Sequence, residues 1–300
     1  METIALKTND GVILAATRFA AEGETKAVVV LPAAMGVAQD FYAPFAEFLA
    51  GQGFAVLTFD YRGMGQSVPS KYRHSLRGFK ADLFDWAERD YNAALHEAKA
   101  WHADAPLLVV GHSLGGQLPG LLPDNHLIDG LITIAAGSGY WQDNAPQLKR
   151  IVWLMWYFAV PLLTPLFGYF PGKMLKMVGD LPKGVIHQWA QWCKSPHYVV
   201  DAAGNPMREG FEKIRVPILS LSFTDDELMS RRSIDSLLDC YKNAQLDRRH
   251  IAPQDIGAKR IGHFGFFRPQ FKTTLWQQAL AWLNARAVGN MEHTAPRTAA

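Results

Sequence analysis

This sequence of 300 residues contains few cysteines and carries almost no net charge. Its two cysteines, Cys193 and Cys240, lie far apart and form no CxxC pattern, which favours free thiols in a reducing compartment. Thirty lysines and arginines against 28 aspartates and glutamates give a formal net charge of +2, which argues against binding to nucleic acid. The start, METIALKTNDG, has an acidic second residue and no apolar core of the kind that a secretory signal needs. These absences predict a cytoplasmic protein.

Sequence motifs that bind metals or nucleotides are missing as well. The chain has no HExxH, no CxxC pair and no tight cluster of histidine and aspartate. No GxxxxGK[ST] or GxGxxG follows a stretch that resembles a strand. The sequence therefore predicts neither a metal nor a cofactor.

One long apolar run stands out, IVWLMWYFAVPLLTPLFGYF at residues 151–170, which contains no charged residue and no histidine. About 20 apolar residues are enough to cross a bilayer. Pro161 and Pro165 would interrupt a span near its middle. No second apolar run of this length is present to bring the chain back across the membrane. We therefore expect two short helices, broken near the prolines. A surface contact with a membrane and a true span remain as alternatives.

Predicted strands alternate with predicted amphipathic helices on both sides of that run. Strands are expected near residues 3–7, 12–19, 27–31, 54–59, 107–110, 131–135, 218–223 and around His250. Such alternation is typical of a mostly parallel sheet with helices on both faces, an α/β fold. The alternation stops over residues 140–202, so we expect an inserted apolar cap there. Residues 1–139 and 203–287 then form the core, and residues 288–300 a disordered tail.

A nucleophile motif directly follows one predicted strand. Gly111-His112-Ser113-Leu114-Gly115 fits GxSxG, and the residues after it can open a helix. In such a turn the serine adopts a strained backbone conformation that exposes its hydroxyl, and the two glycines leave room for it. The N–H of Leu114 then faces any oxyanion that forms. We expect His112 to pack or to form hydrogen bonds.

GHSLGG, together with DYRGMGQS at residues 60–67, resembles the α/β-hydrolase superfamily. The similarity is greatest to its serine-aminopeptidase-like and monoacylglycerol-lipase-like esterases, and it covers residues 2–139 and 203–287. We expect DYRGMGQS to shape a loop. The resemblance implies the α/β-hydrolase fold, in which a serine nucleophile, an acid and a histidine base follow in that order.

The same resemblance implies the other catalytic residues. The family's acid follows a late strand, where Asp226 matches its position better than Asp225 does. The base follows the last strand, where IGHFGFFR supplies His263. A second oxyanion N–H comes from the loop after the third strand, at Met35. Ala33-Ala34-Met35-Gly36 replaces the His-Gly-x-Gly of many relatives there, but a backbone donor needs no particular side chain.

These residues predict a serine hydrolase that cleaves carboxylic esters with an apolar acyl group through an acyl-enzyme. The cap would enclose that group with Trp153, Trp156 and Phe167. An acyltransferase, a thioesterase or a peptidase would use the same three residues, and fold does not decide among them. A membrane-attached binding protein that has kept the fold is the alternative of another class. The expected partner is a small apolar ester, with membrane contact through the cap open and the oligomeric state undetermined.

Overall fold

The computed structural model describes residues 1–175, 177 and 179–294. Its centre is an eight-stranded sheet in the order β1-β2-β4-β3-β5-β6-β9-β10. The eight strands have the following bounds: β1 Glu2–Lys7, β2 Ile13–Phe19, β3 Ala27–Leu31, β4 Phe54–Phe59, β5 Leu107–His112, β6 Gly130–Ile134, β9 Ile218–Phe223 and β10 Leu246–Ile251. These strands confirm the pattern predicted from the sequence.

The sheet is antiparallel at one edge and parallel over the rest of its width. β1 and β2 form an antiparallel hairpin in which β1 is mostly exposed and β2 buries Leu14, Ala16 and Phe19, and β2 also pairs antiparallel with β4. From β4 onward every neighbouring pair is parallel. β3, β4, β5, β6 and β9 are buried along their whole length, as expected for parallel strands covered on both faces.

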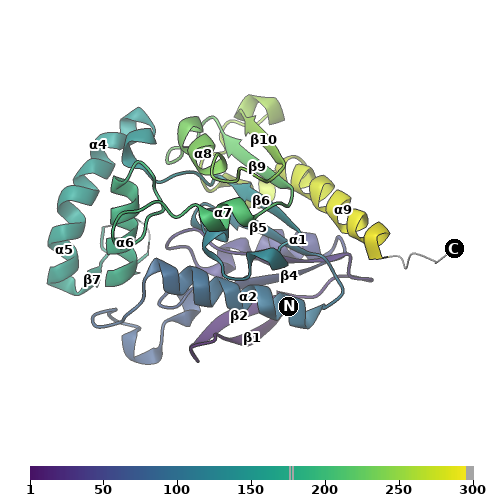
Figure 1. Cartoon of the computed structure of the whole chain (residues 1–300), viewed down its shortest axis with the longest axis horizontal. Coiled ribbons are helices and arrows are strands. Elements are labelled where there is room, and N and C mark those ends of the chain that lie inside the picture. Colours follow the sequence, from purple (N-terminus) through teal and green to yellow (C-terminus); the bar gives the residue numbers. More distant parts are fainter. Residues whose placement is uncertain (176, 178, 295–300) are drawn as a thin grey trace.

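Helices cover both faces of the sheet, and Figure 1 shows α2 in front of it and α1 behind. α1 packs against the last helix, α9, through Phe45 and Trp276, whose ring centroids lie 5.2 Å apart. The α-helices have the following bounds: α1 Ala43–Ala50, α2 Asn92–Trp101, α3 Leu114–Gln117, α4 Pro146–Leu154, α5 Val160–Phe167, α6 Lys183–Lys194, α7 Glu209–Lys213, α8 Arg231–Leu238 and α9 Leu275–Thr294. A π-helical segment, Asp85–Tyr91, leads directly into α2.

The segment between β6 and β9 has its own group of elements, which Figure 1 shows at one side of the molecule. It holds α4, α5, α6 and a short antiparallel pair, β7 Tyr169–Phe170 with β8 Leu181–Pro182. Residues 140–202, for which the sequence predicts a cap, lie within this segment.

The apolar run differs from our expectation of two helices broken at the prolines. α4, a π-helical segment at Met155–Ala159 and α5 follow one another without a gap. Proline lacks an N–H and clashes with the carbonyl four residues before it, which for Pro161 is that of Tyr157. That carbonyl lies inside the π-helical segment, whose wider turn makes room for the ring, so the helix continues.

The C-terminal region also differs from the sequence prediction. α9 continues to Thr294, so the expected tail at residues 288–300 begins as helix. Residues 295–300 lie outside the described residues.

Candidate active site

Ser113 lies at a sharp turn between β5 and α3. Its φ of 48° and ψ of −114° are strained for a residue with a side chain. A Cβ at Gly111 would lie 2.5 Å from the carbonyl oxygen of Gly115, and one at Gly115 would lie 2.2 Å from that of Pro32. Both glycines are therefore required for the turn to close. α3 has only four residues and gives way to a 3₁₀ turn that begins at Pro119, because a proline there has no N–H with which to continue the helix.

Asp226 and His263 form a buried pair. Nδ1 of His263 lies 2.9 Å from Oδ2 and 3.1 Å from Oδ1 of Asp226, and the two side chains are 1% and 2% exposed. Oδ1 of Asp226 also accepts the N–H groups of Leu228 and Met229, which fixes the carboxylate. The carboxylate thus binds the Nδ1–H tautomer and leaves Nε2 with a free electron pair.

Asp225 has a role that the sequence did not predict. Its carboxylate accepts the backbone N–H groups of Ile261 and Gly262 and does not contact the imidazole. Contacts between loops 36 residues apart have no signature in a single sequence.

His112 connects the histidine loop with the loop after β3. Its Nε2 lies 3.0 Å from the carbonyl oxygen of His263, and its Nδ1 lies 2.9 Å from the hydroxyl of Tyr42. A carbonyl only accepts, so Nε2 carries the proton and Nδ1 accepts the Tyr42 O–H. The Tyr42 oxygen in turn accepts the N–H of Ala34. Burial and the nearby His263 hold the pKa of His112 well below its usual value, so the ring is neutral.

Two backbone N–H groups are available for an oxyanion beside Ser113. Ala34 and Met35 line the same cavity as Ser113, and the N–H of Ala34 is already bonded to Tyr42. Neither the N–H of Met35 nor that of Leu114 has an acceptor among the residues that the structure describes. Leu114 is the first residue of α3, whose N-terminal end favours negative charge.

An apolar cavity of about 150 Å³ contains both Ser113 and His263. Seven of the other fifteen lining residues come from α4, the π-helical segment and α6 of the expected cap. The apolar side chains and the thiol of the wall are Ala34, Met35, Leu148, Ile151, Val152, Met155, Trp156, Met177, Trp189, Cys193, Leu228, Met229 and Phe264. Burial raises the pKa of the Cys193 thiol well above its usual value, so it does not compete with Ser113 as a nucleophile.

Of the three residues predicted to line the pocket, one lies in the cavity and two lie outside it. Trp156 lines the cavity and is 3% exposed. Trp153 lies outside it, 39% exposed, because its helix faces the site with Val152 and Trp156 and turns Trp153 toward solvent. Phe167 also lies outside it, since it is 11 residues beyond Trp156, or roughly 16 Å along the helix.

The loop with the sequence DYRGMGQS is tied down by hydrogen bonds and ion pairs, as expected. The buried carboxylate of Asp60 accepts the N–H groups of Gln39 and Gln66, both at 2.8 Å, and burial raises its pKa. Arg62 forms a buried ion pair with Asp90 at 2.7 Å. None of these groups lines the cavity of Ser113.

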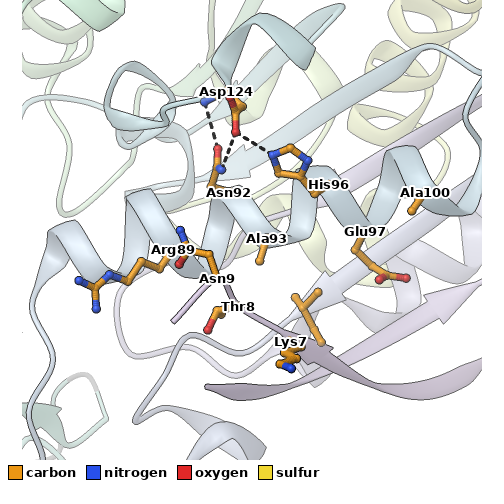
Figure 2. Close-up of a pocket in the computed structure, with 11 residues that line it drawn as sticks. Lys7, Thr8, Asn9, Arg89, Asn92, Ala93, His96, Glu97, Ala100 and Asp124 are labelled. Atoms are coloured by element: carbon orange, nitrogen blue, oxygen red, sulfur yellow. Dashed lines mark hydrogen bonds and ion pairs between the residues drawn. The ribbon is translucent and has the colours of Figure 1, made fainter. Parts of the chain in front are cut away.

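A second cavity, of about 480 Å³, lies between β1 and α2 and is shown in Figure 2. Asp124 accepts hydrogen bonds there from Asn92 at 2.9 Å and from His96 at 2.7 Å. Its one hydroxyl, on Thr8, bonds to Asp10, whereas the histidine of this cavity, His96, bonds to Asp124 and not to Thr8. This cavity therefore lacks the groups of a second hydrolytic site.

Comparisons with known proteins identify the class. The family model described as serine aminopeptidase, S33, matches residues 23–177, which is more than half of the chain. The chain belongs to this family of hydrolases and is an enzyme of the α/β-hydrolase class. No protein of curated function matches its sequence.

Solved structures share its fold at low sequence identity. A soluble variant of monoglyceride lipase from Saccharomyces cerevisiae has a TM-score of 0.63 at 17% identity, covering 95% of this chain and 96% of that one. An esterase from Pyrococcus furiosus has a TM-score of 0.57 at 15% identity, covering 96% and 90%. An esterase from Exiguobacterium antarcticum has a TM-score of 0.58 at 14% identity, covering 94% and 99%.

Proposed function

We propose that the protein is a serine esterase that cleaves carboxylic esters of apolar acyl groups, with Ser113, His263 and Asp226 as its catalytic residues. The observation that carries the proposal is one apolar cavity that holds both a serine on a strained turn and a histidine bonded to a buried aspartate. The ester activities named for the monoglyceride lipase and the two esterases of the same fold support this choice of bond.

In the proposed mechanism His263 acts first as a base. Ser113 Oγ attacks the ester carbonyl while its proton passes to Nε2 of His263, and Asp226 stabilises the imidazolium that forms. The N–H groups of Met35 and Leu114 bind the oxyanion. The imidazolium then donates its proton to the leaving alcohol, and water releases the acyl group by the same steps. The mechanism requires Ser113 Oγ to come within hydrogen-bond distance of Nε2 when substrate binds, a contact that often forms only in the substrate complex.

The apolar wall of the cavity supports the choice of acyl group. The side chains around Ser113 are mostly aliphatic, methionine and tryptophan, and a cavity of about 150 Å³ suits a short or medium acyl chain. A charged acyl group would lose its hydration without gaining an ion pair there. We therefore propose uncharged esters as substrates.

Replacing the nucleophile tests the proposal. Ser113→Ala should abolish the turnover of p-nitrophenyl acetate and labelling by a fluorophosphonate, because each member of such a catalytic group contributes several orders of magnitude in rate. The fold should remain, since the turn is defined by backbone and by Gly111 and Gly115. Circular dichroism provides the control. Turnover at a tenth of the wild-type rate would exclude Ser113 as the nucleophile.

We further propose that the enzyme is cytoplasmic and that it contacts a lipid surface through its cap. Exposed apolar side chains recur every four residues along the helix from α4 to α5, which places them on one outward stripe: Leu154, Phe158, Leu162 and Leu166. By length and composition alone the helix Leu148–Phe167 could cross a membrane. Of its apolar 18-residue stretch, 22% is buried inside the protein. Its inner residues line the cavity of Ser113, so a contact along the surface fits better than a span.

A further inference from the structure

Three consecutive acidic residues, 225–227, follow β9 and hold the loop that carries His263. The middle one binds the imidazole. The carboxylate of Asp225 accepts the N–H of Ile261 at 2.8 Å with one oxygen and that of Gly262 at 3.1 Å with the other. Both of its oxygens are therefore used by the two residues that directly precede the histidine.

Glu227 holds the backbone of the histidine itself. Its Oε2 accepts the N–H of His263 at 3.1 Å, and its Oε1 lies 3.4 Å from the guanidinium of Arg260. The carbonyl of His263 is held from the other side by His112. The N–H and the carbonyl of the histidine are thus both fixed by side chains.

The conformation of this loop suits it to bind carboxylates. Gly262 has a φ of +65°, in the left-handed region, and consecutive N–H groups around such a residue form a concave site that attracts anions. A Cβ at Gly262 would lie 2.9 Å from Oε2 of Glu227. The glycine therefore provides both the turn and the room that the acidic side chains need.

We propose that Asp225 is a positioning residue for His263, supported by Glu227. The inference rests on the proposed function, in which the imidazole must reach both Asp226 and Ser113. The direction in which the imidazole points depends on the position of the His263 Cα. Asp225 fixes that position by binding the N–H groups of the two residues before His263. Without this carboxylate the loop would lose two hydrogen bonds and would leave two donors of a partly buried turn without partners.

Single substitutions with a matched control test the inference. Asp225→Ala should lower kcat for p-nitrophenyl acetate by about 10- to 100-fold, the cost of misplacing a catalytic group by about 1 Å, with KM nearly unchanged. Asp225→Asn should lose less, because its amide oxygen still accepts one N–H. The control is Asp255→Ala, which removes a carboxylate that accepts the N–H of Ala252 at 2.8 Å in another loop. It should leave kcat at the wild-type value.

The Glu227 variants separate positioning from a general loss of stability. Glu227→Gln keeps an oxygen for the N–H of His263 and should retain most of the activity, whereas Glu227→Ala should lose several-fold in kcat. Amide hydrogen exchange at residues 261–263 should be faster in Asp225→Ala than in the wild type, with the rest of the sheet still protected.

Two results would overturn the inference. One is a kcat for Asp225→Ala no lower than that of Asp255→Ala, and the other is unchanged exchange at residues 261–263. Failure of the proposed function would look different. In that case a fluorophosphonate would not label the wild-type protein at all, while the exchange comparison would still decide whether Asp225 holds the loop.

Discussion

At the scale of single residues, the two neighbouring aspartates have different tasks because of the direction in which each side chain points. Asp226 faces the imidazole and Asp225 faces the backbone of the same loop. Residue type and spacing alone do not distinguish the two. This difference changes what we expect from the isosteric substitution at each position.

Asp226→Asn should lower kcat by up to roughly 10⁴-fold, because an amide that donates to Nδ1 would favour the wrong imidazole tautomer. The melting temperature should change little, since an asparagine can keep its oxygen on the N–H groups of Leu228 and Met229. Steady-state kinetics with p-nitrophenyl acetate measures the effect. A larger loss in Asp225→Asn than in Asp226→Asn would exchange the two assignments.

His112 should make the folded state sensitive to acid. Its ring is buried against Tyr42 and His263, and its pKa in the folded protein lies well below that of an unfolded histidine, about 6.5. Below pH 6.5 the unfolded chain therefore binds a proton that the folded chain does not, and the free energy of unfolding decreases as pH falls. The limiting slope for one group is about 1.4 kcal/mol per pH unit.

Urea unfolding at pH 7, 6 and 5 of the wild type and of His112→Gln measures this contribution. Burial raises the pKa of Asp90 to about 6, which acts in the opposite direction between pH 4 and 6, but the variant shares that effect. The difference between the two proteins should therefore isolate the histidine. Parallel pH dependences would show that His112 is not the source.

At the scale of elements, the helix from α4 through α5 has two faces with different surroundings. Its inner face lines the cavity with Val152, Met155 and Trp156, and its outer face exposes an apolar stripe. The π-helical segment at Met155–Ala159 allows the helix to pass Pro161 without a break. One continuous helix therefore connects the acyl cavity with the outer surface.

Substitutions at the two tryptophans of this helix should affect acyl selectivity differently. Trp156→Gln should lower kcat/KM for p-nitrophenyl hexanoate relative to the acetate by roughly 4- to 15-fold, the equivalent of one or two methylene contacts at about 0.8 kcal/mol each. Trp153→Gln, on the same helix but outside the cavity, should leave the ratio unchanged. Equal effects of the two substitutions would contradict the cavity as the acyl site.

Local patterns in the sequence predicted most of the sheet, because buried parallel strands are continuous apolar runs. The turn at Ser113 was predicted as well, because the GxSxG motif contains the glycines that the turn requires. The continuous helix was not predicted, since a proline is a local signal for a break and no residue of the run announces the π-helical turn that makes room for Pro161. Whether Trp153 or Trp156 faces the cavity depends on how the helix is rotated about its axis, and the residue types in the run do not reveal this. The contacts of Asp225 and of Tyr42 join loops that only the fold brings together.

At the scale of the whole molecule, the site unites the two halves of the sheet. Ser113 follows β5, whereas Asp226 and His263 follow β9 and β10, and the cap segment connects the halves. Parallel strands end at the same edge of the sheet, which is why side chains so distant in sequence meet there. The helix that lines the cavity of Ser113 also exposes apolar side chains to solvent, so under the proposed function the cavity wall and the lipid-contacting surface belong to the same helix.

The apolar stripe should therefore bring the protein to lipid. Wild-type protein should sediment with vesicles of phosphatidylcholine and phosphatidylglycerol, since Leu162 and Leu166 are each 67% exposed and would each gain about 1 kcal/mol on leaving water. The double variant Leu162→Asp and Leu166→Asp should bind roughly 30-fold more weakly and should still hydrolyse p-nitrophenyl acetate at the wild-type rate. Ile13→Asp, at an exposed isoleucine on β2, is the control and should sediment like the wild type. A wild type that stays in the supernatant would refute the contact, and a dimer that the double variant dissociates would assign the stripe to a second copy of the chain.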